Sequence, residues 1–478
     1  MDEGATGIEQ GAARGRAVRR RTFLMGMGGA AFLAACGGRA VQPVATLPAA
    51  NAPAAPGEPT VPPPISVNEQ ASKTISFWYN WNTPPQARAA KETVAAFGKA
   101  NPDIGVKLTT GAQVDTKLIP AITAGNPPDV CHIYYTAVLA SKNALLPLDD
   151  YLARSDVIKE DNYTKAQWDA VTWQGKRYAV PALENGPRIG LIWNKGLFRE
   201  AGFDPEKGPS TLNELLQYHE KLTKIDNNGN VKVIGYDPLD AMASSEAFFE
   251  MWANANGVEY YSRDGTKLNL NDPKLIQGVD WVADIYKKIG AEKIAGFRTS
   301  FGGWTGPDSS FAQGLQAIQV NGYWTPGELK AGAKPDQEFG YGWVPVASGK
   351  KFMLEGGHSI ALPRGSKDPD TAFKLIEHMT TPEAGQTMFT ATGFLNGNQQ
   401  FFESGNFSSA PDVTWFTKAD QEADVTAFAP ATLPVLQEIQ TRFTEGMDEV
   451  TRGKRTGKDM LDQLQSQMQK ELDEQLKS

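Results

Sequence analysis

The stretch KTISFWYNWN, residues 73–82, sets the fold class of this chain. Its centre is dense in β-branched and aromatic residues, which predicts a buried strand over 74–79. The residues that follow, 84–97, begin with two prolines and place apolar side chains at helical spacing, which predicts a helix. A second strand is predicted at 104–110, where the sequence reads IGVKLTT. This order of strand, helix and strand is typical of a sheet with helices on its faces.

The same alternation continues along the chain. We expect a strand at 129–134 and two more within 176–198. Ser210 or Thr211, and further on Asp272, are predicted to be N-caps, so a helix is expected after each of these two points. The tail carries an apolar stripe at helical spacing: Met460, Leu461, Leu464, Met468 and Leu472. We therefore predict an α/β protein with mostly parallel sheets, whose last helix packs on the body or, alternatively, binds a partner.

The N-terminal region has the order of an export signal. The stretch RRTFLMGMGGAAFLAAC, residues 20–36, joins two arginines to an apolar run that is too short to cross a bilayer. RRTFL resembles a twin-arginine signal, with the general secretory route as the alternative, and LAAC resembles a bacterial lipobox. We expect a signal peptide at 1–35, a lipid on Cys36 that anchors the chain to the membrane, and a Pro/Ala-rich linker at 36–70.

Composition narrows the classes of function. The 478 residues carry a formal net charge of −8 without blocks of like charge, which argues against a nucleic-acid partner. The four histidines show no metal-ligand spacing, and we find no motif of a hydrolase, a zinc protease or a nucleotide-binding loop. With Cys36 lipidated, Cys131 has no disulfide partner and is expected to be a small buried residue. We therefore expect no metal and no cofactor.

Aromatic residues gather where the predicted strands end. The chain has 11 Trp and 13 Tyr, and several stand beside Gly, Pro or Asn, as in FWYNWN, HIYYT and NGYWTPG. Ligands of open parallel sheets bind at the carboxyl ends of the strands. Flat rings beside Asn, Glu and Arg suit a sugar, which has apolar C–H faces and hydroxyl edges. Simple packing is the alternative for any single ring, so the argument rests on the group.

Five stretches, taken in order, resemble the carbohydrate-type extracellular solute-binding proteins of ABC importers, the group that includes maltose-binding protein. They are ISFWYNW (75–81), ITAGNPPDV (122–130), QGKRYAVPALENGPRIGLIWNKGLFREAGFD (174–204), SSFAQGLQAIQVNGYW (309–324) and EGGHSIALPRGSKDPDTAFKLIEHMTTPEAGQ (355–386). The resemblance covers about 73–478. It implies a two-lobed periplasmic-binding-protein-like fold, a ligand cleft between the lobes that closes by hinge bending, and no catalytic step.

The resemblance also implies an organisation and partners. Lobe 1 would comprise 71–183 and 357–410, and lobe 2 would comprise 184–356 and 411–478. The chain is expected to be a monomer at the outer face of the cytoplasmic membrane, tethered through Cys36. It would capture a carbohydrate and deliver it to the permease subunits of an ABC transporter.

The ligand-binding residues that the resemblance implies are named position by position. They are Asn80, Trp81 and Asn82 after the first strand, Tyr134 and Tyr135 after PPDV, Glu184 and Arg188 in the crossover region, Trp324 after VNGY, His358 after EGG, and the weaker candidates Trp304 and Trp415. Glu184 would accept hydrogen bonds from hydroxyls and Trp324 would stack on a sugar ring. Arg188, which lengthens this stretch relative to much of the family, either pairs with an acidic sugar or forms a surface salt bridge.

Two alternatives of function remain at this stage. The first is a secreted carbohydrate-active enzyme that uses two of the many carboxylates in a similar cleft. The second is a receptor for a non-sugar solute, such as a polyol, a phosphodiester or an opine. A receptor returns its ligand unchanged, whereas an enzyme consumes it.

Overall fold

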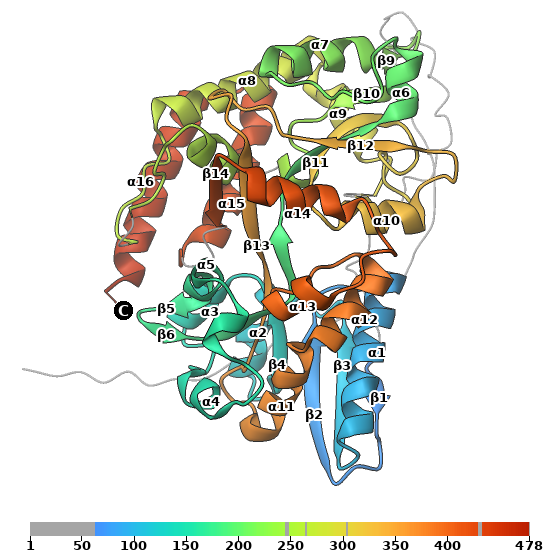
Figure 1. The fold of residues 1–478 in the computed structure, drawn as a ribbon. Helices are drawn as coiled ribbons and strands as arrows, with labels where there is room; N and C mark the ends of the chain where they lie inside the picture. The colour runs from blue at the N-terminus through green and yellow to red at the C-terminus, as the bar shows by residue number, and fades with distance from the viewer. Residues whose placement is uncertain (1–62, 244–247, 263–264, 303–304, 429–432, 478) are drawn as a thin grey trace, which may run out of the picture. The chain divides into compact units, whose positions relative to one another are not determined.

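The computed structural model describes residues 63–243, 248–262, 265–302, 305–428 and 433–477 (Figure 1). The predicted signal peptide, the lipidation site Cys36 and most of the predicted linker lie outside these residues. Trp304, one of the candidate ligand contacts, lies outside them as well.

The first sheet begins with the elements that the N-terminal pattern predicts. Strand β2 (Lys73–Tyr79) runs parallel to β3 (Ile104–Thr110) and to β4 (Val130–Ile133). Alternate residues of β2 are buried, because successive side chains of a strand point to opposite faces. Helix α1 (Pro84–Ala100) connects β2 to β3, starts at a proline as predicted and buries one face. Cys131 in β4 is fully buried, as expected.

The predicted linker ends earlier than expected. Strand β1 (Ile65–Val67) lies within the segment assigned to the linker and pairs antiparallel with β3. Its neighbour Asn68 donates a side-chain hydrogen bond to the Gly98 carbonyl of α1 at 2.7 Å. This strand was not predicted because it is only three residues long and follows a Pro-rich segment. Pairing with β3, rather than its own sequence, stabilises it.

Two long strands, β7 (Ala179–Pro187) and β13 (Phe352–Ala361), lead from the first sheet toward the second sheet (Figure 1). They pair antiparallel with each other. The C-terminal end of β13 pairs with β4, whereas its N-terminal end pairs with β14 (Val425–Phe428). One strand thus joins elements that stand far apart in the sequence, in the order β1-β3-β2-β4-β13-β14.

At Gly357 the two crossing strands approach each other closely. A methyl group at this position would overlap the Glu184 carbonyl and would lie 2.6 Å from the Asn185 Cα. We expect Gly357→Ala to lower the free energy of unfolding by about 2–3 kcal/mol, because the backbones must move apart. Urea denaturation measures this loss. Gly296→Ala in a helix is the control, since nothing lies within 4 Å of its Cβ, and it should be neutral or slightly stabilising; equal effects would contradict the prediction.

The second sheet has the order β12-β8-β11-β10-β9. Its strands are β8 (Gly190–Asn194), β9 (Lys224–Ile225), β10 (Val231–Tyr236), β11 (Gln316–Asn321) and β12 (Phe339–Gly342). Only β10 and β11 are parallel within this described sheet, so the prediction of mostly parallel sheets is wrong here. The first sheet is also mixed. Strands joined by helical crossovers run parallel, whereas a strand such as β8, which arrives directly from β7, runs against its neighbours.

Helices surround both sheets. Those near the first sheet, besides α1, are α2 (Val114–Thr123), α3 (Thr136–Ser141), α4 (Asp149–Arg154), α5 (Lys165–Ala170), α11 (Pro369–Met379), α12 (Pro382–Thr392) and α13 (Gln399–Ser404). The others are α6 (Lys195–Glu200), α7 (Leu212–Leu222), α8 (Pro273–Ile289), α9 (Ala291–Arg298), α10 (Thr325–Gly332), α14 (Val413–Glu422), α15 (Leu436–Thr451) and α16 (Gly457–Gln475). Shorter pieces are β5 (Thr172–Trp173), β6 (Lys176–Arg177), two 3₁₀ turns (Glu160–Asn162, Ala241–Ala243) and a π-helical turn (Glu250–Asn254).

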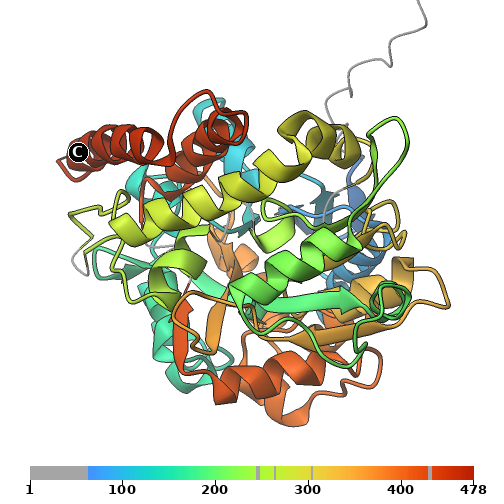
Figure 2. The same cartoon turned by 90° about the horizontal axis from the view of Figure 1, so that it is seen from above.

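The C-terminal helix packs on the body, which confirms the first of the two alternatives predicted for it, and not the binding of a partner. Helix α16 buries its entire predicted apolar stripe and contacts α15 and α8. In Figure 2, α8 lies between α7 on one side and the two red helices, α15 and α16, on the other. The predicted caps also hold, because Thr211 accepts from the Glu214 N–H and Asp272 accepts from the Lys274 N–H.

His219 of α7 provides a pH-dependent contribution to stability. Its side chain is 1% exposed, and Nδ1 accepts a hydrogen bond from the Tyr236 N–H at 3.1 Å, so the neutral ring is the bound form. Burial lowers the pKa of His219 to about 4, from 6.5 in the unfolded chain. The contribution of neutral His219 to the unfolding free energy is therefore fully present above pH 6.5 and is lost as the pH falls toward 4. At pH 5 the loss is about 2 kcal/mol.

We therefore expect His219→Gln to remove about 2 kcal/mol from the difference in unfolding free energy between pH 7 and pH 5. Glutamine can still accept from the Tyr236 N–H, so the variant should fold. Denaturant titrations at both pH values measure the difference. An unchanged pH dependence in the variant would show that His219 does not titrate as described.

Candidate functional site

Glu184 on β7 is the centre of a buried polar cluster. Glu184 is only 2% exposed. The Tyr323 hydroxyl donates to one carboxylate oxygen, and His358 donates to the other from Nδ1–H at 2.8 Å and from its backbone N–H at 3.2 Å. Three donors from β13 and from the residues after β11 therefore meet on one carboxylate.

The backbone of β7 turns Glu184 toward this cluster. Leu183, next to it, has a φ of 77°, a conformation that is strained for a branched side chain. The pairing register with β13 also shifts here, between His358 and Ile360, so that β7 bulges. Bulges re-aim a side chain and are frequent next to functional sites. The site thus rests on a local strain that is held by the two long strands.

Arg188 neutralises the charge at the centre of the cluster. Burial by itself raises the pKa of Glu184, but the His358 hydrogen bond, the Arg188 charge and the Tyr323 hydroxyl lower it below its ordinary value. Glu184 is therefore ionised at neutral pH. Arg188 is 2% exposed and donates from Nη1 to the Tyr134 hydroxyl at 2.8 Å. A surface salt bridge, one of the two interpretations of Arg188, is wrong because the residue is buried.

Aromatic rings enclose this charged pair. The Arg188 guanidinium lies 5.0 Å from the centroid of Tyr134 and 5.7 Å from that of Trp324. The Trp81 ring stands edge-on to His358 and to His132, each with a centroid distance of 4.4 Å. Apolar faces and hydrogen-bonding edges are thus side by side, which is the chemistry that a sugar requires.

Six of the predicted residues come together in this cluster, and four other described candidates lie around it. The six are Trp81, Tyr134, Glu184, Arg188, Trp324 and His358. Asn80 bonds to Asp115 and to the Val114 N–H, so its amide stabilises the loop. Asn82 is exposed, and its side-chain oxygen accepts a hydrogen bond from the Thr110 hydroxyl.

Tyr135 and Trp415 also lie at the margin of the site. The Tyr135 ring contacts Tyr134 and its hydroxyl donates to Gln440 of α15. Trp415 packs on Trp343 and on its neighbour Phe416, over Gly190 at the start of β8.

Three members of the cluster were not predicted from the sequence. They are His132, Phe394 and Tyr323. Tyr323 could have been found as the neighbour of Trp324 in NGYW, and His132 as part of the run HIYY. Phe394 carried no signal, because it follows a helix that is distant in sequence from the other members.

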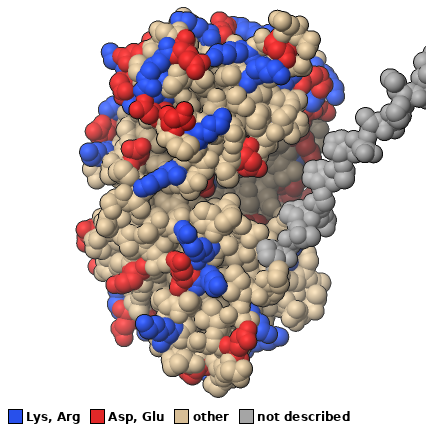
Figure 3. Space-filling view, turned by 90° about the vertical axis from the view of Figure 1, so that its right-hand side faces the viewer, with Lys and Arg blue, Asp and Glu red and all other residues tan. Residues whose placement is uncertain are grey.

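Within the described ranges, the surface was compared with what a nucleic-acid partner, a metal site or a membrane span would require. On the face drawn in Figure 3, acidic and basic side chains are interspersed without a broad area of one sign, and the face is hollowed at mid-height. Among the described residues, no three His, Cys, Asp or Glu side chains come together so as to hold a metal ion. Nor does any helix within the described ranges combine the length and the apolar character of a membrane span.

Comparison with known proteins agrees with this fold. The family model of the bacterial extracellular solute-binding protein matches residues 80–386. A maltotriose-binding protein of Pyrococcus abyssi is 24% identical over 365 residues, covering 74% of this chain and 73% of that protein. The sn-glycerol-3-phosphate-binding periplasmic protein UgpB of Escherichia coli K12 is 23% identical over 424 residues, covering 83% and 91%.

Solved structures show the same two-lobed architecture. CpMnBP1 with mannotriose bound has a TM-score of 0.75 and 25% identity, with 82% of this chain and 99% of that chain covered. The maltose/maltodextrin-binding domain MalE of Bdellovibrio bacteriovorus, bound to maltotriose, has a TM-score of 0.68 and 20% identity, with 85% and 100% covered. Proteins of this kind bind solutes and are not enzymes, which removes the enzyme alternative. The chain belongs to the family of bacterial extracellular solute-binding proteins.

Proposed function

We propose that this protein captures a sugar or oligosaccharide outside the cytoplasm and delivers it to the permease of an ABC importer. The observation that carries the proposal is the Glu184 cluster, an ionised carboxylate whose charge is balanced by Arg188 inside a ring of Trp81, Tyr134, Trp324 and His358. We assign these six residues to ligand binding. The mannotriose and maltotriose in the similar structures support the choice of ligand class.

The balance of charge favours a neutral ligand. A buried phosphate or carboxylate binds strongly where guanidinium N–H groups are left to donate to it. Here the Arg188 guanidinium lowers the pKa of Glu184 and contacts Tyr134, so its charge is already offset within the cluster. A sugar instead uses the faces of the rings and exchanges hydroxyl hydrogen bonds with the carboxylate.

A phosphorylated polyol is the second candidate. Two observations favour it. Arg188 is part of the cluster, and most of the chain is similar to a protein that binds sn-glycerol 3-phosphate. On this alternative the anion would take over the position that Glu184 holds beside Arg188.

A thermal-shift titration separates the two candidates. The panel comprises mannobiose, mannotriose, maltotriose, glucuronate and sn-glycerol 3-phosphate. A ligand at 100 times its Kd adds about 2.7 kcal/mol to the stability, which a raised melting temperature reports. We expect a neutral oligosaccharide to give the shift and to be recovered intact by chromatography. A shift with the phosphate ester alone would favour the second candidate, and a panel without any shift would argue against both.

Membrane tethering is part of the proposal. Cys36 would carry the lipid after removal of 1–35, and the part of 36–70 that precedes β1 would form the leash. The monomeric body would comprise β1 together with the lobes 71–183 with 357–410 and 184–356 with 411–478. Two acyl chains on one cysteine suffice for stable anchoring. Mass spectrometry of the mature N-terminus tests this directly, because a diacylglyceryl group on Cys36 is expected. Cys36→Ser should leave the protein unlipidated and free of the membrane fraction.

A further inference from the structure

A cavity in the second half of the chain shares no residue with the Glu184 cluster. It has a volume of about 180 Å³ and lies among α8, α9 and α15. Its wall is partly apolar, with Phe443 and Met447 of α15, and partly charged. The charged side chains are Arg298 at the end of α9, Arg452 just after α15, and Asp448, which is paired with Arg452. Nothing in the proposed transport function requires a cavity there.

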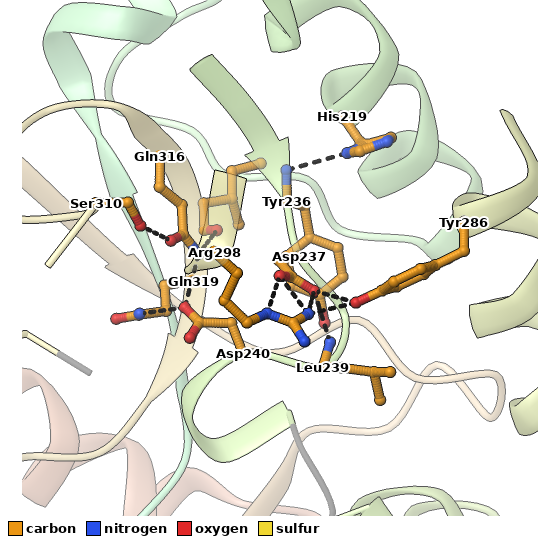
Figure 4. A network of polar contacts seen from close by, with 11 residues as sticks. His219, Tyr236, Asp237, Leu239, Asp240, Tyr286, Arg298, Ser310, Gln316 and Gln319 are labelled. Carbon is orange, nitrogen blue, oxygen red and sulfur yellow. Dashed lines mark hydrogen bonds and ion pairs between the residues drawn. The ribbon is translucent and has the colours of Figure 1, made fainter. Parts of the chain in front are cut away.

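Arg298 is held rigidly by a buried network (Figure 4). Asp237, which is 4% exposed, accepts from Arg298 Nε at 3.0 Å and from Nη2 at 2.6 Å, and it also accepts from the Tyr286 hydroxyl at 2.8 Å. Behind it, Asp240 accepts from the side-chain amides of Gln316 and Gln319 at 3.0 and 2.6 Å. The guanidinium at the cavity wall is thus fixed in orientation before any ligand arrives.

Both arginines keep donors that the described residues do not use. Arg298 bonds through Nε and Nη2, and within the described ranges its Nη1 has no acceptor. Arg452 bonds through Nε to Asp448 and through Nη1 to Glu292, and no described residue accepts from its Nη2. The Glu292 side chain is 83% exposed, so this ion pair is weak and easily replaced.

We propose that this cavity is a second binding site, which takes a small organic carboxylate with an apolar body. The carboxylate would bind Arg298 and Arg452, because the planar guanidinium matches its geometry, while the body would rest on Phe443 and Met447. An empty cavity of about 150 Å³ holds benzene, so a volume of about 180 Å³ has room for a six-membered ring. The site is independent of the ligand that the Glu184 cluster binds.

The test compares 4-fluorobenzoate with its neutral isostere 4-fluorobenzamide, by ¹⁹F NMR titration of the purified protein. We expect the acid to bind at least tenfold more tightly than the amide, because only the acid can pair with the two guanidinium groups. Binding should persist in Trp81→Ala, since that residue belongs to the other site. Equal binding of acid and amide, or no binding of the acid at millimolar concentration, would overturn the proposal.

Two variants locate the binding. Arg452→Met should weaken the binding of 4-fluorobenzoate at least tenfold, while the melting temperature of the variant stays within a few degrees of wild type. Lys454→Met, an exposed neighbour outside the cavity wall, is the matched control and should bind as wild type does. Met447→Trp fills the cavity and should abolish binding. Wild-type affinity in Arg452→Met would refute the site whatever the fate of Met447→Trp.

Discussion

Glu184→Gln should be among the most damaging single substitutions in this protein. The carboxylate is buried and accepts from Tyr323 and His358 while it offsets the charge of Arg188. Replacing the carboxylate removes a buried negative charge that the His358 ion contact and the nearby Arg188 charge stabilise, and breaking buried charge interactions of this kind costs about 3–5 kcal/mol. Urea denaturation at pH 7 should show a loss of this size, and the affinity for the ligand found in the thermal-shift panel should fall by more than tenfold.

Two controls separate the charge from the hydrogen bonds. Tyr323→Phe removes a single donor to the same carboxylate and should cost about 1.5–3 kcal/mol, less than the loss of the charge. Glu474→Gln removes an exposed carboxylate, whose pair with Lys470 is long and solvated, and should change the stability by less than about 1 kcal/mol. If Glu184→Gln were as harmless as Glu474→Gln, the charge of Glu184 would not contribute to the stability.

Trp81→Ala should abolish most of the ligand affinity. The ring contacts His132, His358 and Phe394 and is only partly buried, so that it combines a packing role with a free face. Loss of these contacts should lower the unfolding free energy by about 3 kcal/mol. We expect the ligand affinity to fall at least tenfold, as measured by calorimetric titration at a temperature where the variant remains folded.

Trp281→Ala is the matched control for this substitution. Trp281 is also partly buried and contacts Trp252 and Tyr236 in the second half of the chain, away from the Glu184 cluster. It should lower the stability to a similar extent and leave the ligand affinity unchanged. An equal loss of affinity in both variants would show that destabilisation, and not contact with the ligand, explains the effect of Trp81→Ala.

The local elements of the fold could be predicted because their signals are local. The prolines before α1, the cap at Thr211 and the stripe of α16 each act within a few residues, and the structure confirms them. The direction of the strands in the second sheet could not be predicted. It depends on where a segment such as β8 comes from, which a pattern of apolar residues does not encode.

The site was predicted as a set of residues and not as an arrangement. His358 and Glu184 are 174 positions apart, and Tyr323 and Glu184 are 139 apart, so no spacing rule joins them. The strained backbone at Leu183 leaves no trace in the sequence, because leucine ordinarily avoids positive φ. The resemblance to a family supplied Glu184 and Trp324, whereas burial of Arg188 emerged only when the two long strands were in place.

The position of β13 also determines when during synthesis this protein can finish folding. The Cys131 thiol on β4 contacts the Ala361 carbonyl on β13, across 230 positions of the chain. At about 5–20 residues per second, a ribosome takes about 10–50 s to make that interval. During this time one side of β4 has no strand beside it, and an unpaired strand edge readily recruits other chains. Until β13 has emerged, this edge of the first sheet is therefore open to pairing with other chains.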